Sequence, residues 1–254
     1  MSGLAGKHVV VTGGGTGIGL AVAKAMTQMR ATVTIMGRDR DRLEQAAGRL
    51  IGTRAIACDV SKATSVAQAF RQAQANSGRI DVLVNNAGTV ESAPFGKMDE
   101  DAFRRMLDVN LMGVFHASQA VLPGMLESGW GRIINVASTA GLKGYAYVSG
   151  YVASKHAVIG LTRSLALETA KKGITVNAVC PGYTETEIVT TAIDRIASKT
   201  GRSTSEARAD LEAGNPQGRL IQPEEVAATV LWLADPAQSA LTGQAIAIAG
   251  GEVM

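Results

Sequence analysis

Residue types that build metal centres and disulfide frameworks are scarce in this 254-residue chain. It contains three scattered histidines and two cysteines, Cys58 and Cys180. Histidines this few and this far apart suggest no metal site. Both cysteines lie in apolar, strand-like stretches, so we expect buried thiols in a reducing cytoplasm and no disulfide.

Long apolar runs and an excess of one charge are also missing. No stretch approaches the roughly 20 apolar residues of a membrane span. The N-terminal stretch MSGLAGKHVVVTGGG lacks the apolar core and cleavage site of a signal peptide. The net charge is only +3 and the basic residues are dispersed. We therefore expect a cytoplasmic protein without a nucleic-acid or membrane partner.

The chain does contain short apolar segments that alternate with longer amphipathic ones, without linkers or repeats. Segments so rich in Val and Ile are typical of strands buried on both faces, and strand–helix alternation predicts a parallel sheet with helices on both sides. With right-handed crossovers, this gives a single-domain, doubly wound Rossmann fold of about seven strands over residues 1–254. The expected strands are 7–13, 31–37, 54–60, 80–88, 131–138, 174–182 and 243–251.

A glycine-rich stretch, TGGGTGIG (12–19), follows the first expected strand and opens the first helix. Residues without a Cβ permit a tight turn and close approach of a phosphate, and the helix N-terminus supplies free N–H groups. Many strand–helix turns contain glycine, but this context favours a dinucleotide site. The expected contacts are Gly13, Gly15, Thr16, Gly17, Ile18 and Gly19.

The end of the second strand separates two cofactors. An acid there would bind the ribose 2′-hydroxyl of NAD, whereas an arginine suits the 2′-phosphate of NADP. The strand is followed by Arg38, which could form a forked contact to a phosphate. Asp39 follows, where a loop could point it away. Arg38 could also be an ordinary solvated residue, but we favour NADP(H) over NAD(H).

The stretch YVASK places Tyr151 and Lys155 four residues apart on one helical face. Taken alone, this is most simply an ordinary surface pair. With further stretches in the same order, however, the chain resembles the short-chain dehydrogenase/reductase family. The stretches are TGGGTGIG, the DV of 59–60, NNAG (85–88), Asn110, Ser138, YVASK (151–155) and PGYTET (181–186).

The resemblance implies a catalytic set of Asn110, Ser138, Tyr151 and Lys155. A phenol with a pKa near 10 needs a nearby cation to lower that value, so Tyr151 is the expected proton donor and Lys155 its tuner. Ser138 would donate a hydrogen bond to the substrate oxygen, or could bond only its own backbone. Asn110 would help to hold a water, or could simply be a structural amide.

The resemblance also implies which residues position the cofactor and the substrate. Asp59 and Val60 would frame the adenine, and Asn85 would line the site or brace neighbouring backbone. The remaining expected cofactor contacts are Ala87, Gly88, Tyr151, Lys155, Pro181, Gly182, Thr184 and Thr186. The expected substrate contacts are Ser138, Tyr145, Tyr147 and Tyr151, whereas Trp130 is expected to be structural packing.

Residues 187–215 interrupt the alternation and read as two amphipathic helices with a polar turn, which resembles the family's substrate lid. Arg195, Lys199, Arg202 and Arg208 in this region could meet phosphates of coenzyme A or an acyl carrier, or could be a solvated face.

Within the family, the chain is most similar to reductases of 3-oxoacyl thioesters and polyketide ketones. The expected activity is NADP(H)-dependent interconversion of a ketone and a secondary alcohol, most simply a 3-oxoacyl thioester and its 3-hydroxyacyl form. Alternatives are a secondary-alcohol dehydrogenase for a cyclic or aromatic substrate and a non-catalytic nucleotide sensor. The resemblance further implies a homotetramer.

Overall fold

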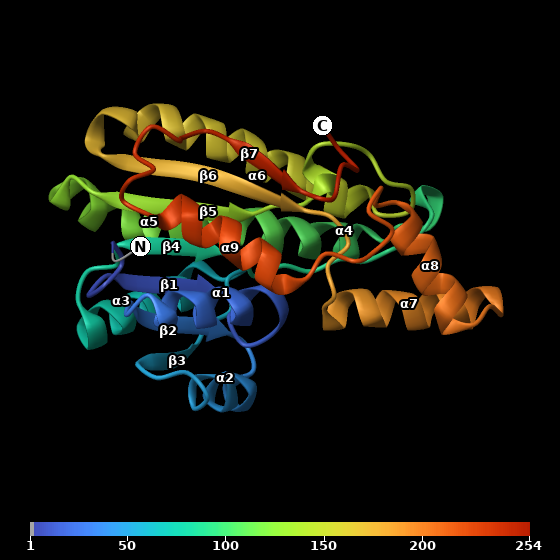
Figure 1. Cartoon of the computed structure of the whole chain (residues 1–254), viewed down its shortest axis with the longest axis horizontal. Coiled ribbons are helices and arrows are strands. Elements are labelled where there is room, and N and C mark those ends of the chain that lie inside the picture. The colour runs from blue at the N-terminus through green and yellow to red at the C-terminus, as the bar shows by residue number, and fades with distance from the viewer. Residues whose placement is uncertain (1–2) are drawn as a thin grey trace.

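The computed structural model describes residues 3–254 and contains one seven-stranded parallel sheet (Figure 1). The strand order is β3-β2-β1-β4-β5-β6-β7, so the direction of winding reverses between β1 and β4. The strands are β1 (His8–Thr12), β2 (Thr32–Gly37), β3 (Thr53–Ala57), β4 (Val82–Asn85), β5 (Gly131–Val136), β6 (Ile174–Pro181) and β7 (Ala245–Ile248). This confirms the predicted doubly wound fold, with a strand inside each of the expected segments except for one residue at the start of β3.

The central strands are buried along their whole length, as expected of a sheet covered on both faces. All residues of β1, β4, β5 and β6 are buried. Parallel neighbours place all carboxyl ends at one edge, where ligands of such sheets bind. The stretches that follow β1, β4, β5 and β6 therefore come together at this edge.

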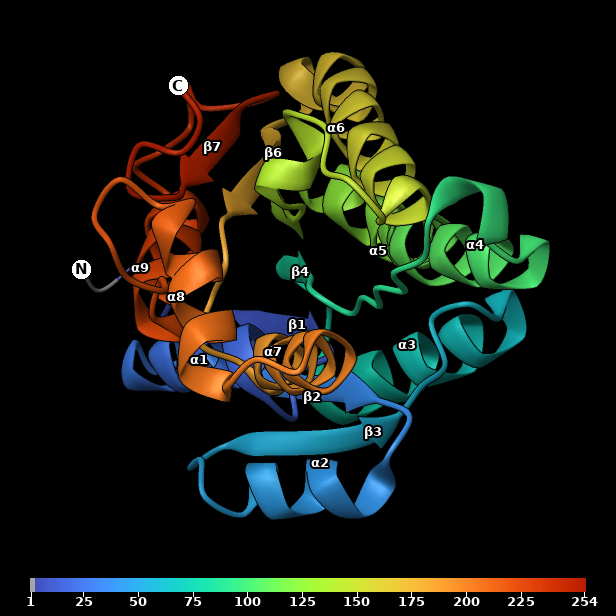
Figure 2. The same cartoon turned by 90° about the vertical axis from the view of Figure 1, so that its right-hand side faces the viewer.

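Helices cover both faces of the sheet, as Figure 2 shows end-on. The helices are α1 (Gly17–Gln28), α2 (Arg40–Ala47), α3 (Ala63–Ser77), α4 (Glu100–Leu107), α5 (Gly113–Ser128), α6 (Ser149–Thr169), α7 (Glu187–Thr200), α8 (Thr204–Ala213) and α9 (Pro223–Ala234). Shorter helical turns are η1 (Phe95–Lys97), η2 (Asp108–Met112), η3 (Thr139–Gly141) and η4 (Ala170–Lys172). Helices α1 and α9 pack in one core, and α3 and α5 in the other, with α6 beside α5.

Helices α7 and α8 break the alternation and lie beyond the carboxyl ends of the strands (Figure 1). Gly201, at φ +71°, ends α7 in the left-handed conformation that favours glycine. Ser203 and Glu206 then form a capping box that begins α8. The two helices expected within 187–215 are therefore present, and their polar turn has a local cause.

Candidate active site

The glycine loop between β1 and α1 has little room for side chains. Gly13 lies at φ +63°, and a Cβ there would come within 2.9 Å of the Ala87 Cα. A Cβ at Gly19 would lie 2.2 Å from the Gly13 carbonyl oxygen. Thr16 precedes α1 without using its side chain as a cap, which leaves N–H groups of the first turn open to an acceptor. A loop of this shape fits a dinucleotide pyrophosphate.

The loop is held from behind by Asn86, which sequence reasoning did not single out. Its Nδ2 donates to the carbonyl oxygens of Thr12 (3.1 Å) and Gly13 (3.0 Å). The Thr12 hydroxyl in turn accepts from the backbone N–H groups of Asn86 (3.0 Å) and Ala87 (3.1 Å). These bonds tie the end of β4 to the glycine loop across the point where winding reverses.

Asn85 bonds to side chains inside the sheet and its helical cover. Its side chain is buried and its Nδ2 donates to Asn135 Oδ1 (2.9 Å) and to Ser118 Oγ (3.3 Å). These partners lie on β5 and α5, inside the sheet and its cover. These bonds favour the bracing alternative for Asn85, and a contact with the cofactor stays a prediction.

Two exposed residues, Arg38 and Asp39, follow β2 directly. Asp39 caps α2, because its Oδ1 accepts from the Arg42 N–H at 3.0 Å. Arg38 is near enough to Asp59 to act on its charge. Burial alone would raise the pKa of Asp59, but hydrogen bonds from Ser61 and the charges of Lys62 and Arg38 lower it.

Val60, beside Asp59, packs against α5. A Cβ placed on Gly113 would come within 2.8 Å of Val60 Cγ2. The Val60 carbonyl oxygen lies 3.3 Å from His116 Nδ1. Both contacts hold the segment after β3 in place, while the Asp59 carboxylate stays partly accessible.

The expected catalytic side chains meet at the carboxyl end of β5. Ser138 follows β5 and its hydroxyl lies against the phenol of Tyr151. Lys155, one turn further along α6, has its Nζ 5.6 Å from the centre of the Tyr151 ring. The Nζ donates to the Val136 carbonyl oxygen at 2.8 Å, and a Cβ on Gly88 would lie 3.8 Å from it. The structure thus brings together Ser138, Tyr151, Lys155 and Gly88.

Burial has the largest effect on the ionisation of this group. The pKa of Tyr151 is raised mainly by its burial, with smaller effects of Ser138, Tyr183 and Cys180. Burial also lowers the pKa of Lys155 to about 8. The lowering of the Tyr151 pKa by Lys155 that the resemblance implies stays a prediction.

Asn110 lies in η2, a π-helical turn between α4 and α5. Its Oδ1 accepts from the Thr89 N–H (2.8 Å), and its Nδ2 donates to the Thr89 carbonyl (2.9 Å) and to Ser154 Oγ (3.0 Å). The Ser154 hydroxyl donates to the Tyr151 carbonyl oxygen at 2.7 Å. The Asn110 side chain therefore joins the segment after β4 to α6, which agrees with a structural amide.

Two of the expected substrate residues have different surroundings. The Tyr145 hydroxyl lies 2.7 Å from Thr139 Oγ1, next to Ser138, and its ring meets Tyr183 edge-on with the centroids 6.3 Å apart. Tyr147 is 64% exposed, with φ +68°. Tyr145 therefore belongs to the wall beside Ser138, together with Tyr183, which was not singled out. The exposed Tyr147 side chain does not take part in this wall.

Trp130 lies just before β5, at the opposite end of the sheet from the catalytic group. Lys7 Nζ lies 4.1 Å and Arg132 Cζ 4.7 Å from its ring centre. This agrees with structural packing.

The loop after β6 closes on the glycine loop. A Cβ on Gly17 would come within 3.1 Å of Thr186 Cγ2. Thr186 Oγ1 donates to the Thr184 carbonyl (3.2 Å), and Thr184 Oγ1 donates to that of Gly182 (3.0 Å). The segment from Pro181 to Thr186 therefore lies where a cofactor on the glycine loop would pass.

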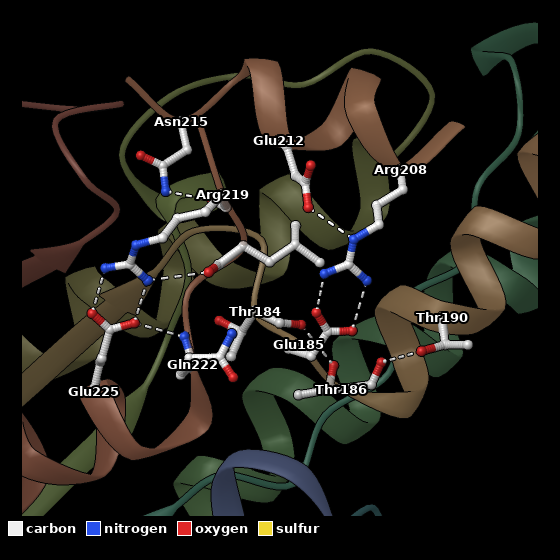
Figure 3. A network of polar contacts seen from close by, with 11 residues as sticks. Thr184, Glu185, Thr186, Thr190, Arg208, Glu212, Asn215, Arg219, Gln222 and Glu225 are labelled. Carbon is white, nitrogen blue, oxygen red and sulfur yellow. Dashed lines mark hydrogen bonds and ion pairs between the residues drawn. The ribbon is translucent and has the colours of Figure 1, made fainter. Parts of the chain in front are cut away.

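Helix α8 is joined to this loop by the ion pair of Arg208 with Glu185, as Figure 3 shows. The Arg208 guanidinium on α8 forms a two-pronged contact with Glu185 and a bond of 2.8 Å to Glu212. Arg202 pairs with Asp210 on α8, and Arg195 donates to the Ser92 carbonyl. Three of the four basic residues considered for phosphate binding are therefore already engaged, which weakens that interpretation.

Two further properties bear on the function. No helix within residues 3–254 is long and apolar enough to cross a membrane. In the same residues, His, Cys, Asp and Glu side chains form no group that could hold a metal ion.

The chain is similar in sequence and structure to known oxidoreductases. The model of the short chain dehydrogenase family matches residues 7–196. D-beta-hydroxybutyrate dehydrogenase of Cupriavidus necator is 38% identical, over 98% of this chain and 99% of that protein. Acetoacetyl-CoA reductase of an Acinetobacter species is 35% identical, over 98% of both chains. A variant of actinorhodin polyketide ketoreductase, solved with NADPH, has a TM-score of 0.94 and 36% identity, over 97% of each chain.

Proposed function

This chain belongs to the short chain dehydrogenase family and is an oxidoreductase, and we propose that it is an NADP(H)-dependent ketoreductase of 3-oxoacyl thioesters. Members of this family use a nicotinamide cofactor. The observation that carries the proposal is the meeting of Ser138, Tyr151 and Lys155 at the carboxyl end of β5, facing the glycine loop across the reversal point.

The residues present fit such a cofactor. The glycine loop would hold the pyrophosphate, because Gly13 and Gly19 let the loop turn tightly against its own backbone and Asn86, and the first N–H groups of α1 stay open to an acceptor. Lys155 and Tyr151 would hold the nicotinamide ribose, and Pro181, Gly182, Thr184 and Thr186 its carboxamide side. When bound, the nicotinamide supplies or accepts the hydride.

The protein's own groups manage the substrate oxygen and its proton. Ser138 donates a hydrogen bond to the ketone oxygen, which orients it and stabilises developing negative charge. Tyr151 donates its proton to that oxygen as the alcohol forms, and accepts it in the reverse direction. Lys155 stabilises the phenolate that Tyr151 leaves behind. A raised pKa in the protein alone keeps Tyr151 protonated and ready to donate.

The preference for NADP(H) is supported by Arg38 and by the use of Asp39 as a helix cap. An acid that accepts a backbone N–H of α2 is poorly placed to bind a ribose 2′-hydroxyl. A similar structure was solved with NADPH. The thioester substrate is supported by the names of two similar proteins, an acetoacetyl-CoA reductase and a polyketide ketoreductase.

We further propose a homotetramer in the cytoplasm. Helices α5, α6 and α9 expose large apolar side chains that the chain's own sheet does not cover: Phe115, Leu126, Leu167 and Trp232. Strand β7 lies at an open edge of the sheet. A second copy of the chain would cover these surfaces. The two free, buried cysteines agree with a reducing compartment.

The test is oxidation of NADPH in the presence of a panel of ketones. The panel contains acetoacetyl-CoA, longer 3-oxoacyl thioesters, cyclic ketones and aryl diketones, each assayed with NADPH and with NADH. We expect the highest kcat/KM with NADPH and a 3-oxoacyl thioester. A higher kcat/KM for a cyclic or aromatic ketone than for every thioester would refute the thioester assignment.

A further inference from the structure

The glycine loop is bordered by two segments that are distant in sequence. A Cβ on Gly15 would lie 3.7 Å from Arg42 Cγ, which belongs to α2. A Cβ on Gly17 would lie 3.1 Å from Thr186 Cγ2, directly before the start of α7. Helix α2 therefore borders the loop at Gly15, and the start of α7 borders it at Gly17.

An ion pair joins these two borders. Arg42 Nη1 donates to Oε2 of Glu187, the first residue of α7, at 2.7 Å, and the two residues are 145 positions apart. Asp39, which caps α2, lies with its Oδ2 3.8 Å from Arg42 Nε and also attracts the guanidinium. Figures 1 and 2 show α7 beyond the carboxyl ends of β1 and β2. The Arg42–Glu187 pair therefore links α2 to α7 across the glycine loop.

This pair is one of three places where polar side chains join α7 and α8 to the rest of the fold within residues 3–254. Arg208 reaches the loop after β6, and Arg195 reaches the loop after β4. Only Glu187 reaches the half of the sheet formed by β1, β2 and β3, through Arg42. If this pair breaks, the start of α7 can move away from α2 while the other two contacts stay in place.

The charge of Glu187 is unfavourable for a dinucleotide site unless it is paired. The pyrophosphate of the cofactor would bring negative charge to the glycine loop, and Glu187 adds a charge of the same sign at the border of that loop. Like charges at short range repel, which would weaken cofactor binding. Arg42 neutralises this carboxylate. The pairing of Glu187 therefore matters to the cofactor site.

We propose that Arg42 and Glu187 are positioning residues of the cofactor site, whose ion pair retains the bound dinucleotide at the glycine loop and opens before the cofactor leaves. The inference rests on the proposed cofactor site, but not on the preference for NADP(H) or on the thioester substrate. The two side chains are 49% and 67% exposed. Exposed ion pairs add little to stability, so this pair can open and close without loss of the fold.

The test is the dissociation rate constant of NADPH and of NADH, measured by stopped-flow fluorescence with excess oxidised cofactor as the displacing ligand. Glu187→Gln should raise this rate constant by about three- to fivefold. The sign is diagnostic, because loss of a negative charge near the phosphates would by itself slow dissociation. Glu44→Gln is the matched control. It removes the same charge and breaks the Arg40–Glu44 pair within α2, and it should leave the rate constant within about 1.5-fold of wild type.

An exchange of the two charges tests whether the pair itself acts. Arg42→Glu alone places two acids opposite each other and should speed dissociation more than Glu187→Gln does. The double variant Arg42→Glu/Glu187→Arg restores a pair of opposite charges, so its rate constant should return to within about twofold of wild type. If Arg42 acted instead by binding a cofactor phosphate, the double variant would stay as fast as Arg42→Glu, and the inference would be overturned.

The outcomes also separate this inference from the proposed function. A rate constant for Glu187→Gln that is unchanged or lower than that of wild type would overturn the inference, and would leave Glu187 only as a favourable acid in the first turn of α7. If wild type binds NADH alone and the variants change its dissociation as expected, the preference for NADP(H) fails and the ion pair keeps its role. Binding of neither cofactor would overturn both.

Discussion

At the scale of single residues, the phenol of Tyr151 is the group on which turnover should depend most. Tyr151→Phe removes the proton donor but keeps the ring in its place. We expect kcat to fall by about 10²–10⁴-fold, the usual contribution of general acid catalysis. The dissociation constant of NADPH, measured by fluorescence titration, should stay within about threefold. A Phe variant with half of the wild-type kcat would remove Tyr151 from its role.

The buried charge of Lys155, beside Tyr151, should lower the free energy of unfolding of the protein. Burial lowers its pKa from the ordinary 10.5 to about 8. Between these pH values the unfolded chain binds more protons than the folded one, so the free energy of unfolding should rise with pH across this window. At pH 7 the penalty of the buried charge amounts to about 3 kcal/mol.

Lys155→Met should therefore stabilise the protein at pH 7, by about 1–3 kcal/mol, because loss of the bond to Val136 offsets part of the gain. It should also abolish turnover and weaken NADPH binding. The check is urea unfolding of both proteins at pH 7 and pH 10, with cofactor absent. The stability difference between variant and wild type should shrink at the higher pH. A variant less stable than wild type at pH 7 would contradict this account.

Arg38 should set the choice of cofactor. A charge-assisted contact to a phosphate contributes about 1.5–3 kcal/mol, so Arg38→Ala should raise the KM for NADPH by roughly 10- to 100-fold. The KM for NADH should change little. Arg40→Ala is the matched control, because Arg40 is an exposed neighbour that pairs with Glu44 on its own helix. Equal effects of Arg38→Ala on the two cofactors would exclude a 2′-phosphate contact.

At the scale of elements, the strands and the lid helices could be predicted because each has a local cause. Runs such as the Val9–Val11 segment have one suitable environment, a strand covered on both faces, and Gly201 with Ser203 marks the break between α7 and α8. Contacts between distant segments could not be predicted in this way. Asn85 and Asn86 are adjacent and chemically identical, and only the packing of β4 against β5 and β1 shows that Asn86 holds the glycine loop.

The same limit applies to Glu252 and to the Tyr151 pKa. The buried Glu252 accepts from the Tyr145 hydroxyl, but nothing in the stretch GGEVM distinguishes a buried partner of Tyr145 from a solvated acid. The resemblance places Lys155 near Tyr151, and the two side chains do lie close together. The sequence does not show how deeply Tyr151 is buried, and burial is the largest cause of its raised pKa.

The attachment of α8 to the loop after β6 should depend on Arg208. Arg208 joins α8 to Glu185 on the loop after β6, whereas Arg202 pairs with Asp210 within the lid. Arg208→Met should therefore increase hydrogen exchange in residues 187–213 and raise the KM for the ketone several-fold. Arg202→Met is the control and should leave both closer to wild type. Similar effects of the two variants would mean that the contact with Glu185 does not fix the lid.

At the scale of the whole molecule, the exposed apolar side chains predict assembly. Light scattering should give a mass near four times the 26.3 kDa of one chain. Phe115, on α5, is 40% exposed, and Phe115→Lys should lower the mass by placing a charge in the covered surface. Lys24→Glu, on α1, exchanges one exposed charge for another and serves as the control. A wild-type mass near that of one chain, with full activity, would rule out a tetramer as a requirement.

The all-parallel sheet also has a consequence for how the chain acquires its structure. Parallel neighbours cannot be joined by a short hairpin, so every strand pair closes a long loop before its first hydrogen bond forms. Strand β1 comes first in the chain, but its Val9 pairs with Val82 of β4. That edge of β1 therefore stays unpaired until β4 docks. Chains dominated by such distant contacts fold slowly. During that time the valine-rich edges of β1 and β4 are unpaired and can join those of other chains, so recovery from denaturant should be best in dilute solution.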